Sequence, residues 1–194
     1  FEYADKGSAF SDECFEKLGC PVFVKPANTG SSVGVSKASD KKELENAIKD
    51  AFKYDKKIVV EECIVGREVE CAVLGNSDPA ASVVGEIKPA NEFYDYDAKY
   101  KNGSSVLLIP APLEEKTSEE IRSLAVKIFK SLNCSGLSRV DFFVQSDGKV
   151  KFNEINTLPG FTPISMYPKL FDECGIKYPD LIDRLLNLAI EREA

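Results

Sequence analysis

Two segments near the C-terminus that read as β-strands, residues 138–144 and 150–156, flank an Asp147-Gly148 pair. Both positions of an Asp-Gly pair accept the positive φ angles of a two-residue hairpin turn, which sets Ser146 opposite Lys149. We therefore expect the two segments to be the arms of one antiparallel β-hairpin. This feature constrains the fold strongly, because the turn decides which residues of the two strands face each other.

Four polar residues meet on one face of the hairpin when the register is counted outward from this turn. Asp141 faces Glu154, and Arg139 faces Asn156 in the same register, because side chains alternate by two along a strand. Facing residues have Cβ atoms roughly 5 Å apart, so two ionised carboxylates there repel each other unless a cation lies between them. Carboxylate and amide oxygens favour Mg²⁺ over a transition metal, so we predict metal ligands at Asp141, Glu154 and Asn156.

The alternative is that these acidic residues decorate a solvated sheet face, as charged pairs usually do. The neighbouring residues favour the metal site. By the same count, Phe143 and Phe152 share the face of the carboxylates. The opposite face takes four apolar residues, Val140, Phe142, Val144 and Ile155. We expect the hairpin to be buried on both faces, and buried charges need partners.

The composition excludes several chemistries. The chain of 194 residues contains no histidine, so catalytic triads, imidazole acid-base work and His-ligated zinc are excluded within it. Its six cysteines form no Cys-x-x-Cys pair and lie among apolar residues, which is typical of reduced, buried thiols in a cytosolic protein, although spacing alone leaves a disulfide open. They are Cys14, Cys20, Cys63, Cys71, Cys134 and Cys174.

The charge balance bears on partners and compartment. A net charge of -7 and a pI near 4.9 argue against nucleic acid or an anionic membrane as a partner. No apolar run approaches the roughly 20 residues that span a bilayer, and the first residues show no signal-peptide pattern. We expect a cytoplasmic protein. The absence of an initial Met favours a piece of a longer chain whose upstream region is missing.

A short apolar strand at residues 21–26 contains Lys25 and leads into a small-residue loop at residues 27–35. Loops of Gly and Ser let backbone N–H groups and hydroxyls surround phosphate oxygens, and a preceding lysine supplies positive charge. A Gly-Ser hairpin turn beside a surface lysine is the alternative. The segment is not a Walker A loop, because no Gly-Lys-Ser/Thr follows.

Helices alternate with strand segments along the rest of the chain. Asp40 and Glu43 are placed to cap a helix to about Phe52, and Thr117 with Glu120 is placed to cap another to about Leu132. Strand-like segments occupy the region between Ile58 and Ile87. The aromatic run at 91–105 shows neither the periodicity of a helix nor that of a strand, which favours a long functional loop. The predicted class is α+β.

Five separated motifs together resemble the D-alanine:D-alanine ligase family, including its D-alanine:D-serine members of vancomycin resistance (VanG, VanC and VanE types). They are Val24-Lys25-Pro26, Gly30-Ser31-Ser32-Val33-Gly34, Phe93-Tyr94-Asp95-Tyr96 with Ala98-Lys99-Tyr100, Arg139-Val140-Asp141, and the run from Asn153 to Thr162. The resemblance implies an ATP-grasp fold, in which two α+β lobes hold ATP. Residues 1–64 then form the later part of the central lobe and residues 65–194 the C-terminal lobe, without the N-terminal domain.

The resemblance also implies a nucleotide site with Mg²⁺, as two ions, with Mn²⁺ as a substitute. The resemblance implies that Lys25 and Ser32 contact the nucleotide phosphates and that Glu68 contacts the ribose. The adenine is placed against Glu61, Cys63, Ile64 and Phe93. Lys99 is assigned both to the nucleotide and to a substrate carboxylate. Asp141, Glu154 and Asn156 match the family's metal ligands, in agreement with the hairpin register.

The implied reaction has two steps. The carboxylate of one D-alanine attacks the γ-phosphate of ATP, and the amine of a second D-amino acid then attacks the acyl phosphate. Arg139 and the Gly160 N–H match the oxyanion site for the tetrahedral adduct. Ser31 and Tyr100 fix and close the loop over the first substrate. Lys99 and Ser165 hold the second substrate's carboxylate, with Met166 lining its pocket.

The loop at 93–100 is retained and histidine is absent, which within the family favours an amine nucleophile, D-alanine or D-serine, over D-lactate. Two other classes stay open: another ATP-grasp carboxylate-amine ligase, and a non-catalytic Mg-nucleotide-binding module. A homodimer is expected when the upstream domain is present. The chain alone is expected to be inactive, because the family's second phosphate lysine and a substrate-binding glutamate lie upstream.

Overall fold

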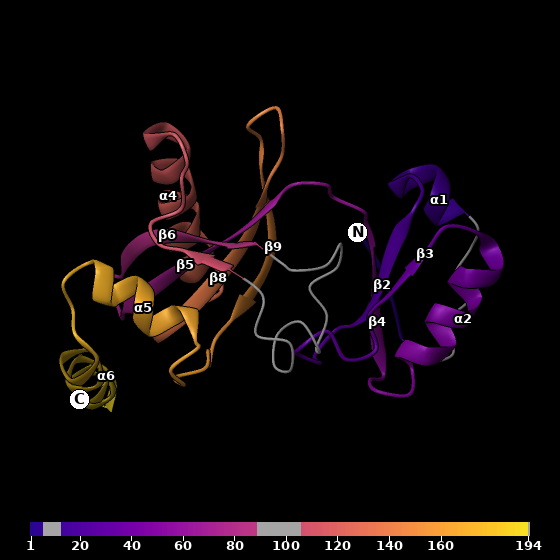
Figure 1. Cartoon of the computed structure of the whole chain (residues 1–194). Helices are drawn as coiled ribbons and strands as arrows, with labels where there is room; N and C mark the ends of the chain where they lie inside the picture. Colours follow the sequence, from indigo (N-terminus) through magenta and orange to yellow (C-terminus); the bar gives the residue numbers. More distant parts are fainter. Residues whose placement is uncertain (6–12, 89–105, 194) are drawn as a thin grey trace. The chain divides into compact units, whose positions relative to one another are not determined.

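The computed structural model describes residues 1–5, 13–88 and 106–193 (Figure 1). These residues divide into two compact units. Unit 1 contains residues 1–64, and unit 2 contains Val65–Lys88 and the chain from Val106 onward. The expected loop residues Phe93, Lys99 and Tyr100 lie outside the described ranges. Each unit has its own sheet and its own hydrophobic core.

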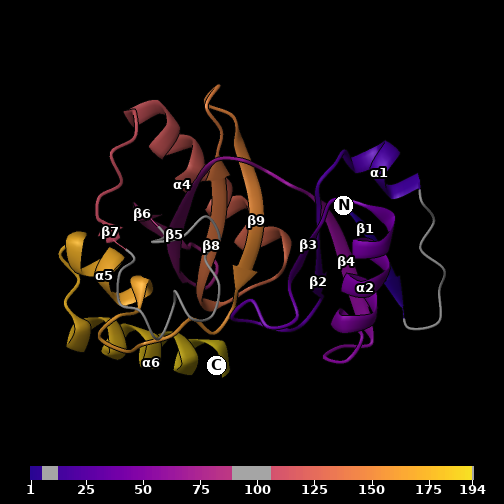
Figure 2. The ribbon, with the colours of Figure 1, turned by 45° about the vertical axis from the view of Figure 1, so that its right-hand side comes forward.

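Unit 1 is a four-stranded sheet with the strand order β1-β4-β2-β3, and all three neighbouring pairs are antiparallel (Figure 2). Two helices, α1 and α2, pack on one face of it through a cluster of buried residues that includes Val22, Val24, Leu44 and Ile58. The elements are β1 (Glu2–Asp5), α1 (Glu13–Leu18), β2 (Val22–Pro26), β3 (Ser36–Ala38), α2 (Lys41–Ala51) and β4 (Lys57–Glu62).

The start of α2 follows directly from its sequence. The Asp40 carboxylate accepts a hydrogen bond from the Glu43 N–H at 2.8 Å, and the Glu43 carboxylate accepts one from the Ser39 N–H at 2.8 Å. The expected Asp40 cap is thereby confirmed. Such a cap contributes about 1 kcal/mol, because it satisfies N–H groups that have no partner inside the helix.

Unit 2 is a five-stranded antiparallel sheet with the strand order β7-β6-β5-β8-β9. Helix α4 covers one face, while α5 contacts β6 on the opposite face (Figure 1). The elements are β5 (Arg67–Gly75), β6 (Ala80–Lys88), β7 (Val106–Leu108), α4 (Glu115–Ser131), β8 (Gly136–Val144), β9 (Val150–Asn156), α5 (Met166–Glu173) and α6 (Tyr178–Glu193).

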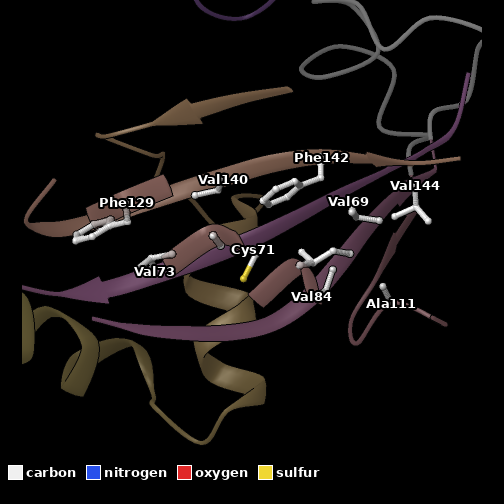
Figure 3. Packing of buried hydrophobic residues seen from close by; sticks show 11 residues of the cluster. Val69, Cys71, Val73, Val84, Ala111, Phe129, Val140, Phe142 and Val144 are labelled. Carbon is white, nitrogen blue, oxygen red and sulfur yellow. The ribbon is translucent and has the colours of Figure 1, made fainter. Parts of the chain in front are cut away.

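The core of unit 2 lies between α4 and the sheet (Figure 3). Alternate residues of β5 and β8 point into it, among them Cys71, Val140 and Phe142, and Phe129 of α4 packs against them. The expected capping of α4 by Thr117 was wrong. This helix begins at Glu115, its N-cap residue is Glu114, and no side chain caps it.

The β8–β9 hairpin forms as expected, but its turn is longer than predicted. The Gln145 N–H donates to the Lys149 carbonyl at 2.9 Å, which leaves a three-residue loop, Ser146 to Gly148. Of these three residues, Gly148 has a positive φ, 83°. This loop shifts the pairing by one residue, so that Phe142 faces Phe152. A bulge at Asn153 then shifts it back, and Asp141 faces Glu154 with Arg139 facing Asn156, as predicted.

The expectation that the hairpin is buried on both faces was wrong for β9. This strand is at the edge of the sheet, and the Glu154 side chain is exposed. Phe152, predicted on the carboxylate face, instead lies opposite the buried Phe142 and is 47% exposed. The difference follows from the loop, because a one-residue shift moves a side chain to the other face.

All six cysteines are free thiols. The expectation of burial was correct for Cys14 and Cys71 and wrong for Cys20 and Cys174, which are exposed. Across the described residues, no helix is both long and apolar enough to cross a membrane.

Candidate functional site

Three carboxylates form a row across the middle of the unit 2 sheet. Antiparallel pairing places Glu70 of β5 opposite Asp141 of β8, and Asp141 opposite Glu154 of β9. The fourth position of the row, on β6, is Gly85. Neighbouring members are roughly 5 Å apart at Cβ, so the row concentrates negative charge. Hereafter Glu70, Asp141 and Glu154 are called the carboxylate row.

Arg139 lies between the two buried members of the carboxylate row. Its Nε and Nη2 atoms each donate to one Asp141 carboxylate oxygen, both at 2.8 Å. The same Nε is 3.1 Å from Oε2 of Glu70. Asp141 is 3% exposed and Glu70 4%, so the guanidinium supplies the counter-charge that buried carboxylates require.

The pKa of Arg139 reflects these contacts. Burial favours loss of the proton, but the charges of Asp141, Glu70 and Glu154 outweigh it and raise the pKa above its usual value. Arg139 is therefore a permanent cation at this site. In the described ranges, no group of three Cys, Asp or Glu side chains is arranged so that it could hold a metal ion. The Asp141 carboxylate is instead hydrogen-bonded to Arg139.

The chemistry of the donor set nevertheless fits a hard cation. Asp141 and Glu154 face each other, and Asn156, in the next row, is on the same face of β9 beside Arg139. The Asn156 amide oxygen accepts a hydrogen bond from the Leu158 N–H at 3.1 Å, which orients it and leaves a second lone pair. Carboxylate and amide oxygens are ligands that Mg²⁺ accepts. The exposed Glu154 gives solvent access to this edge.

In unit 1, Lys25 and Glu61 lie on the sheet face opposite the helices. Phe23 of β2 pairs with Glu61 of β4, which brings Lys25, two residues along β2, into diagonal contact. The Lys25 Nζ and Glu61 Oε2 atoms are 2.7 Å apart. The resemblance implies that Lys25 contacts the phosphates of a nucleotide and Glu61 its adenine, and these two side chains form an ion pair. Cys63 and Ile64 follow directly after β4.

The small-residue loop after β2 has an unusual backbone. Ser31 and Ser32 both adopt the left-handed conformation, with φ of 57° and 58°. This conformation is uncommon for residues other than glycine and typically occurs at functional sites. The base of the loop is anchored at Asn28, whose backbone and side-chain N–H groups donate to Asp55 at 2.7 and 3.0 Å. These hydrogen bonds lower the pKa of Asp55. No local pattern in the sequence indicated this anchor.

The loop at residues 157–165 brings Gly160 and Ser165 together. A Cβ atom at Gly160 would lie 2.8 Å from the Ser165 Oγ atom, so a side chain there would displace Ser165. The Ser165 hydroxyl also accepts a hydrogen bond from the Thr162 N–H at 3.0 Å. Met166 begins α5 and is buried against Gly85, where a Cβ would lie 2.9 Å from its sulfur. Gly85 thus makes room for α5.

Two acidic residues of β5 share the face of the carboxylate row. Glu68, expected at the ribose, pairs with Phe143 of β8, and Glu70 follows two residues along the strand. Glu70 was missed by the sequence analysis. The Glu-x-Glu alternation in β5 would have indicated a second acidic side chain on this face, but only the pairing of β5 with β8 identifies its neighbours.

Comparisons with known proteins agree with this architecture. A family model described as D-ala D-ala ligase C-terminus matches residues 2–187. The D-alanine--D-alanine ligase of Acetivibrio thermocellus is 63% identical over 93% of this chain and 48% of its own length. That of Oceanobacillus iheyensis is 56% identical over 99% of the chain and 53% of its own length. The chain spans about half the length of the curated relatives it matches.

Solved structures give the same result. The D-alanine-D-alanine ligase from Coxiella burnetii matches with a TM-score of 0.83 and 37% identity over 98% of this chain and 52% of its own. The VanG D-Ala:D-Ser ligase from Enterococcus faecalis matches with a TM-score of 0.81 and 42% identity over 91% and 51%. Two antiparallel sheets with flanking helices thus define an α+β protein of the ATP-grasp fold, as predicted. The chain belongs to the D-alanine–D-alanine ligase C-terminal family.

Proposed function

We propose that this chain is the catalytic, C-terminal part of an ATP-dependent ligase that joins D-alanine to a second D-amino acid for peptidoglycan precursor synthesis. The observation that carries the proposal is the meeting of Asp141, Glu154 and Asn156 beside Arg139 on one face of the β8–β9 hairpin. Family membership over residues 2–187 supports the same reaction. Residues 1–64 correspond to the later part of the central lobe, and residues 65–194 to the C-terminal lobe.

Asp141, Glu154 and Asn156 hold Mg²⁺, as two ions, with Mn²⁺ as a substitute. When bound, this metal neutralises charge on the transferring phosphoryl group. Lys25 and Ser32 bind the nucleotide phosphates, and Glu61, Cys63, Ile64, Phe93 and Lys99 bind the rest of the nucleotide, with Glu68 on the ribose. The ion pair between Lys25 and Glu61 supports a common ligand for both residues, because their charged ends lie 2.7 Å apart.

Arg139 and the Gly160 N–H stabilise the oxyanion that forms when the second amine attacks the acyl phosphate. Arg139 suits this role because it stays charged. Ser165 and Lys99 bind the carboxylate of the second substrate, and Ser31 with Tyr100 holds the loop over the first. The closeness of Gly160 to the Ser165 hydroxyl supports placing the oxyanion site next to the carboxylate site.

The second substrate is D-alanine or D-serine. The curated relatives are named D-alanine--D-alanine ligases, and VanG is a D-Ala:D-Ser ligase. The two amino acids differ by a single hydroxyl, and a pocket without a dedicated hydrogen bond discriminates such a pair poorly. We place Met166, which is buried against Gly85, at the wall of this pocket, and its thioether is at most a weak acceptor. Free thiols and the use of ATP support a cytoplasmic enzyme, and we propose that the complete enzyme is a homodimer.

A competition assay tests the proposal. The chain is extended with the upstream half of the Acetivibrio thermocellus relative and given equal D-alanine and D-serine with Mg-ATP. Mass spectrometry then identifies the dipeptides. D-alanyl-D-alanine as the main product assigns a housekeeping ligase, and D-alanyl-D-serine assigns a resistance ligase. The control is the Asp141→Asn variant, which should give neither dipeptide.

Two alternatives give different results in the same assay. Another carboxylate-amine ligase would consume ATP only with other acids and amines, and a nucleotide-binding module would bind Mg-ATP without forming any product. Either result from a folded, nucleotide-binding protein would contradict the proposal.

A further inference from the structure

Glu70 has no role in the proposed reaction, yet it is buried in the centre of the site. It occupies the inner end of the carboxylate row, on the third strand from the edge. Its side chain is only 4% exposed, and it lies 3.1 Å from the Arg139 Nε atom. Burial of a third carboxylate beside Asp141 is unfavourable unless a specific interaction compensates for it. The contact with Arg139 is that interaction.

Arg139 is shared unequally between its two acidic neighbours. Asp141 accepts two hydrogen bonds from the guanidinium, one at each oxygen, whereas the Glu70 Oε2 atom lies 3.1 Å from the Nε atom. Both Asp141 oxygens are therefore directed at Arg139. A divalent cation at Asp141 and Glu154 needs at least one of these oxygens turned toward the metal.

The guanidinium must keep an anionic partner when Asp141 turns to a cation. Arg139 is largely buried, and removing one partner from a buried ion pair is strongly destabilising. Glu70 is already in contact with the same Nε atom and is directed to it from the neighbouring strand. Glu70 is therefore placed to keep the guanidinium paired with an anion.

We propose that Glu70 is a positioning residue that retains the Arg139 guanidinium in the site while Asp141 binds a divalent cation. The proposal rests on the proposed function, because it assumes the metal role of Asp141. It predicts that Glu70 acts on metal binding through Arg139, and not as a ligand or a general source of negative charge.

A double-mutant cycle on metal binding tests this inference. Mn²⁺ binding to the chain is measured by the loss of the free-ion electron paramagnetic resonance signal. Glu70→Gln should weaken Mn²⁺ binding about tenfold, because Arg139 then has Asp141 as its remaining strong partner. Arg139→Gln should tighten binding by freeing Asp141. In the Arg139→Gln background, Glu70→Gln should change the affinity by less than about twofold.

The outcomes separate the two proposals. An equal loss on Glu70→Gln in both backgrounds means that Glu70 acts by charge or as a ligand, and overturns this inference alone. Mn²⁺ binding that is unchanged by Asp141→Asn overturns the metal site, and this inference with it.

A second measurement does not require Arg139→Gln to fold. The Arg139 Nε–H resonance in a ¹⁵N spectrum, assigned by its loss in Arg139→Lys, reports whether the guanidinium stays hydrogen-bonded. On addition of Mg²⁺ it should remain protected from solvent exchange in the wild type and lose protection in Glu70→Gln. Equal protection in both proteins would overturn the role of Glu70.

Discussion

At the scale of single residues, Arg139 is the group on which the site depends. It is held by Asp141 at both carboxylate oxygens and lies next to Glu70, so it neutralises two buried acids. In the proposed reaction the same cation also stabilises an oxyanion. Removal of this one side chain should therefore affect both the stability of the protein and the proposed catalysis.

Arg139→Ala should lower turnover about a hundredfold in the extended protein, with little change in the KM for ATP, because an oxyanion donor acts mainly in the transition state. It should also lower the free energy of unfolding by about 3–5 kcal/mol, since Glu70 and Asp141 then face each other without a counter-charge. Steady-state kinetics and urea denaturation measure the two effects. Lys149→Ala is the control, because its ion pair with Asp147 is exposed and should not affect either quantity. Unchanged turnover for Arg139→Ala would contradict the oxyanion role.

The cysteines should differ sharply in reactivity. Burial raises the pKa of Cys71 to about 12, so at pH 8 only about one molecule in ten thousand carries the reactive thiolate. Iodoacetamide at pH 8 should label the exposed Cys20 and Cys174 of the native protein and leave Cys71 unmodified until the protein is denatured. Peptide mapping by mass spectrometry measures this. Rapid labelling of Cys71 would mean that the core of unit 2 opens readily.

At the scale of elements, the β8–β9 hairpin shows how far local sequence can predict a site. The pairing of Asp141 with Glu154 was correct, but it was derived from a two-residue turn that does not form. The three-residue loop and the bulge at Asn153 each shift the register by one, and the two shifts cancel. A local pattern indicates a turn between the strands, but tertiary packing decides where an extra residue is accommodated.

The loop depends on Gly148. Its φ of 83° is unfavourable for a residue with a Cβ atom, although no other atom lies within 4 Å of where that Cβ would be. Gly148→Ala should therefore lower the free energy of unfolding by about 1 kcal/mol through backbone strain alone. Gly148→Asn is the matched variant and should cost less, because asparagine tolerates the left-handed conformation. Urea denaturation followed by circular dichroism measures both. Equal stability of the wild type, Gly148→Ala and Gly148→Asn would contradict a left-handed backbone conformation at residue 148.

Helix boundaries were predictable where a side chain forms the cap. Asp40 does so for α2, whereas α4 begins at Glu115 without a side-chain cap, and the Thr117 and Glu120 pair lies inside the helix. The segment before this helix is held to the sheet by the Ala111 N–H hydrogen bond to the Val84 carbonyl at 2.7 Å. Such a contact between distant segments leaves no signal in the local sequence.

At the scale of the whole molecule, the sequence predicted the α+β class and the ATP-grasp fold, but not every neighbour in the site. Glu70 and Asp141 are far apart in the chain and meet only because β5 pairs with β8. The strand order β7-β6-β5-β8-β9 is a property of the folded sheet, which no local pattern encodes. The facing of Asp141 and Glu154 was predictable because these residues lie close in sequence on the two arms of one hairpin.

The chain spans about half the length of its relatives, which leads to a prediction for the molecule as a whole. Alone it should bind Mn²⁺ in an Asp141-dependent way and form no dipeptide, because the family resemblance implies that a second phosphate lysine and a substrate-binding glutamate lie outside the present residues. Mass spectrometry of the products after prolonged incubation with Mg-ATP and D-alanine measures this. Dipeptide formed by the chain alone would show that the site is complete without those segments.

The paired register shifts in the β8–β9 hairpin have a consequence for insertions and deletions. Removing Asn153 alone would give a regular ladder behind the same three-residue loop, with Asp141 still facing Glu154. Removing one further residue of β9 between the loop and the bulge would move Glu154 opposite Phe142, on the other face of the sheet. The bulge is therefore the position at which this hairpin should tolerate a one-residue deletion, and the two carboxylates of the proposed metal site would remain face to face.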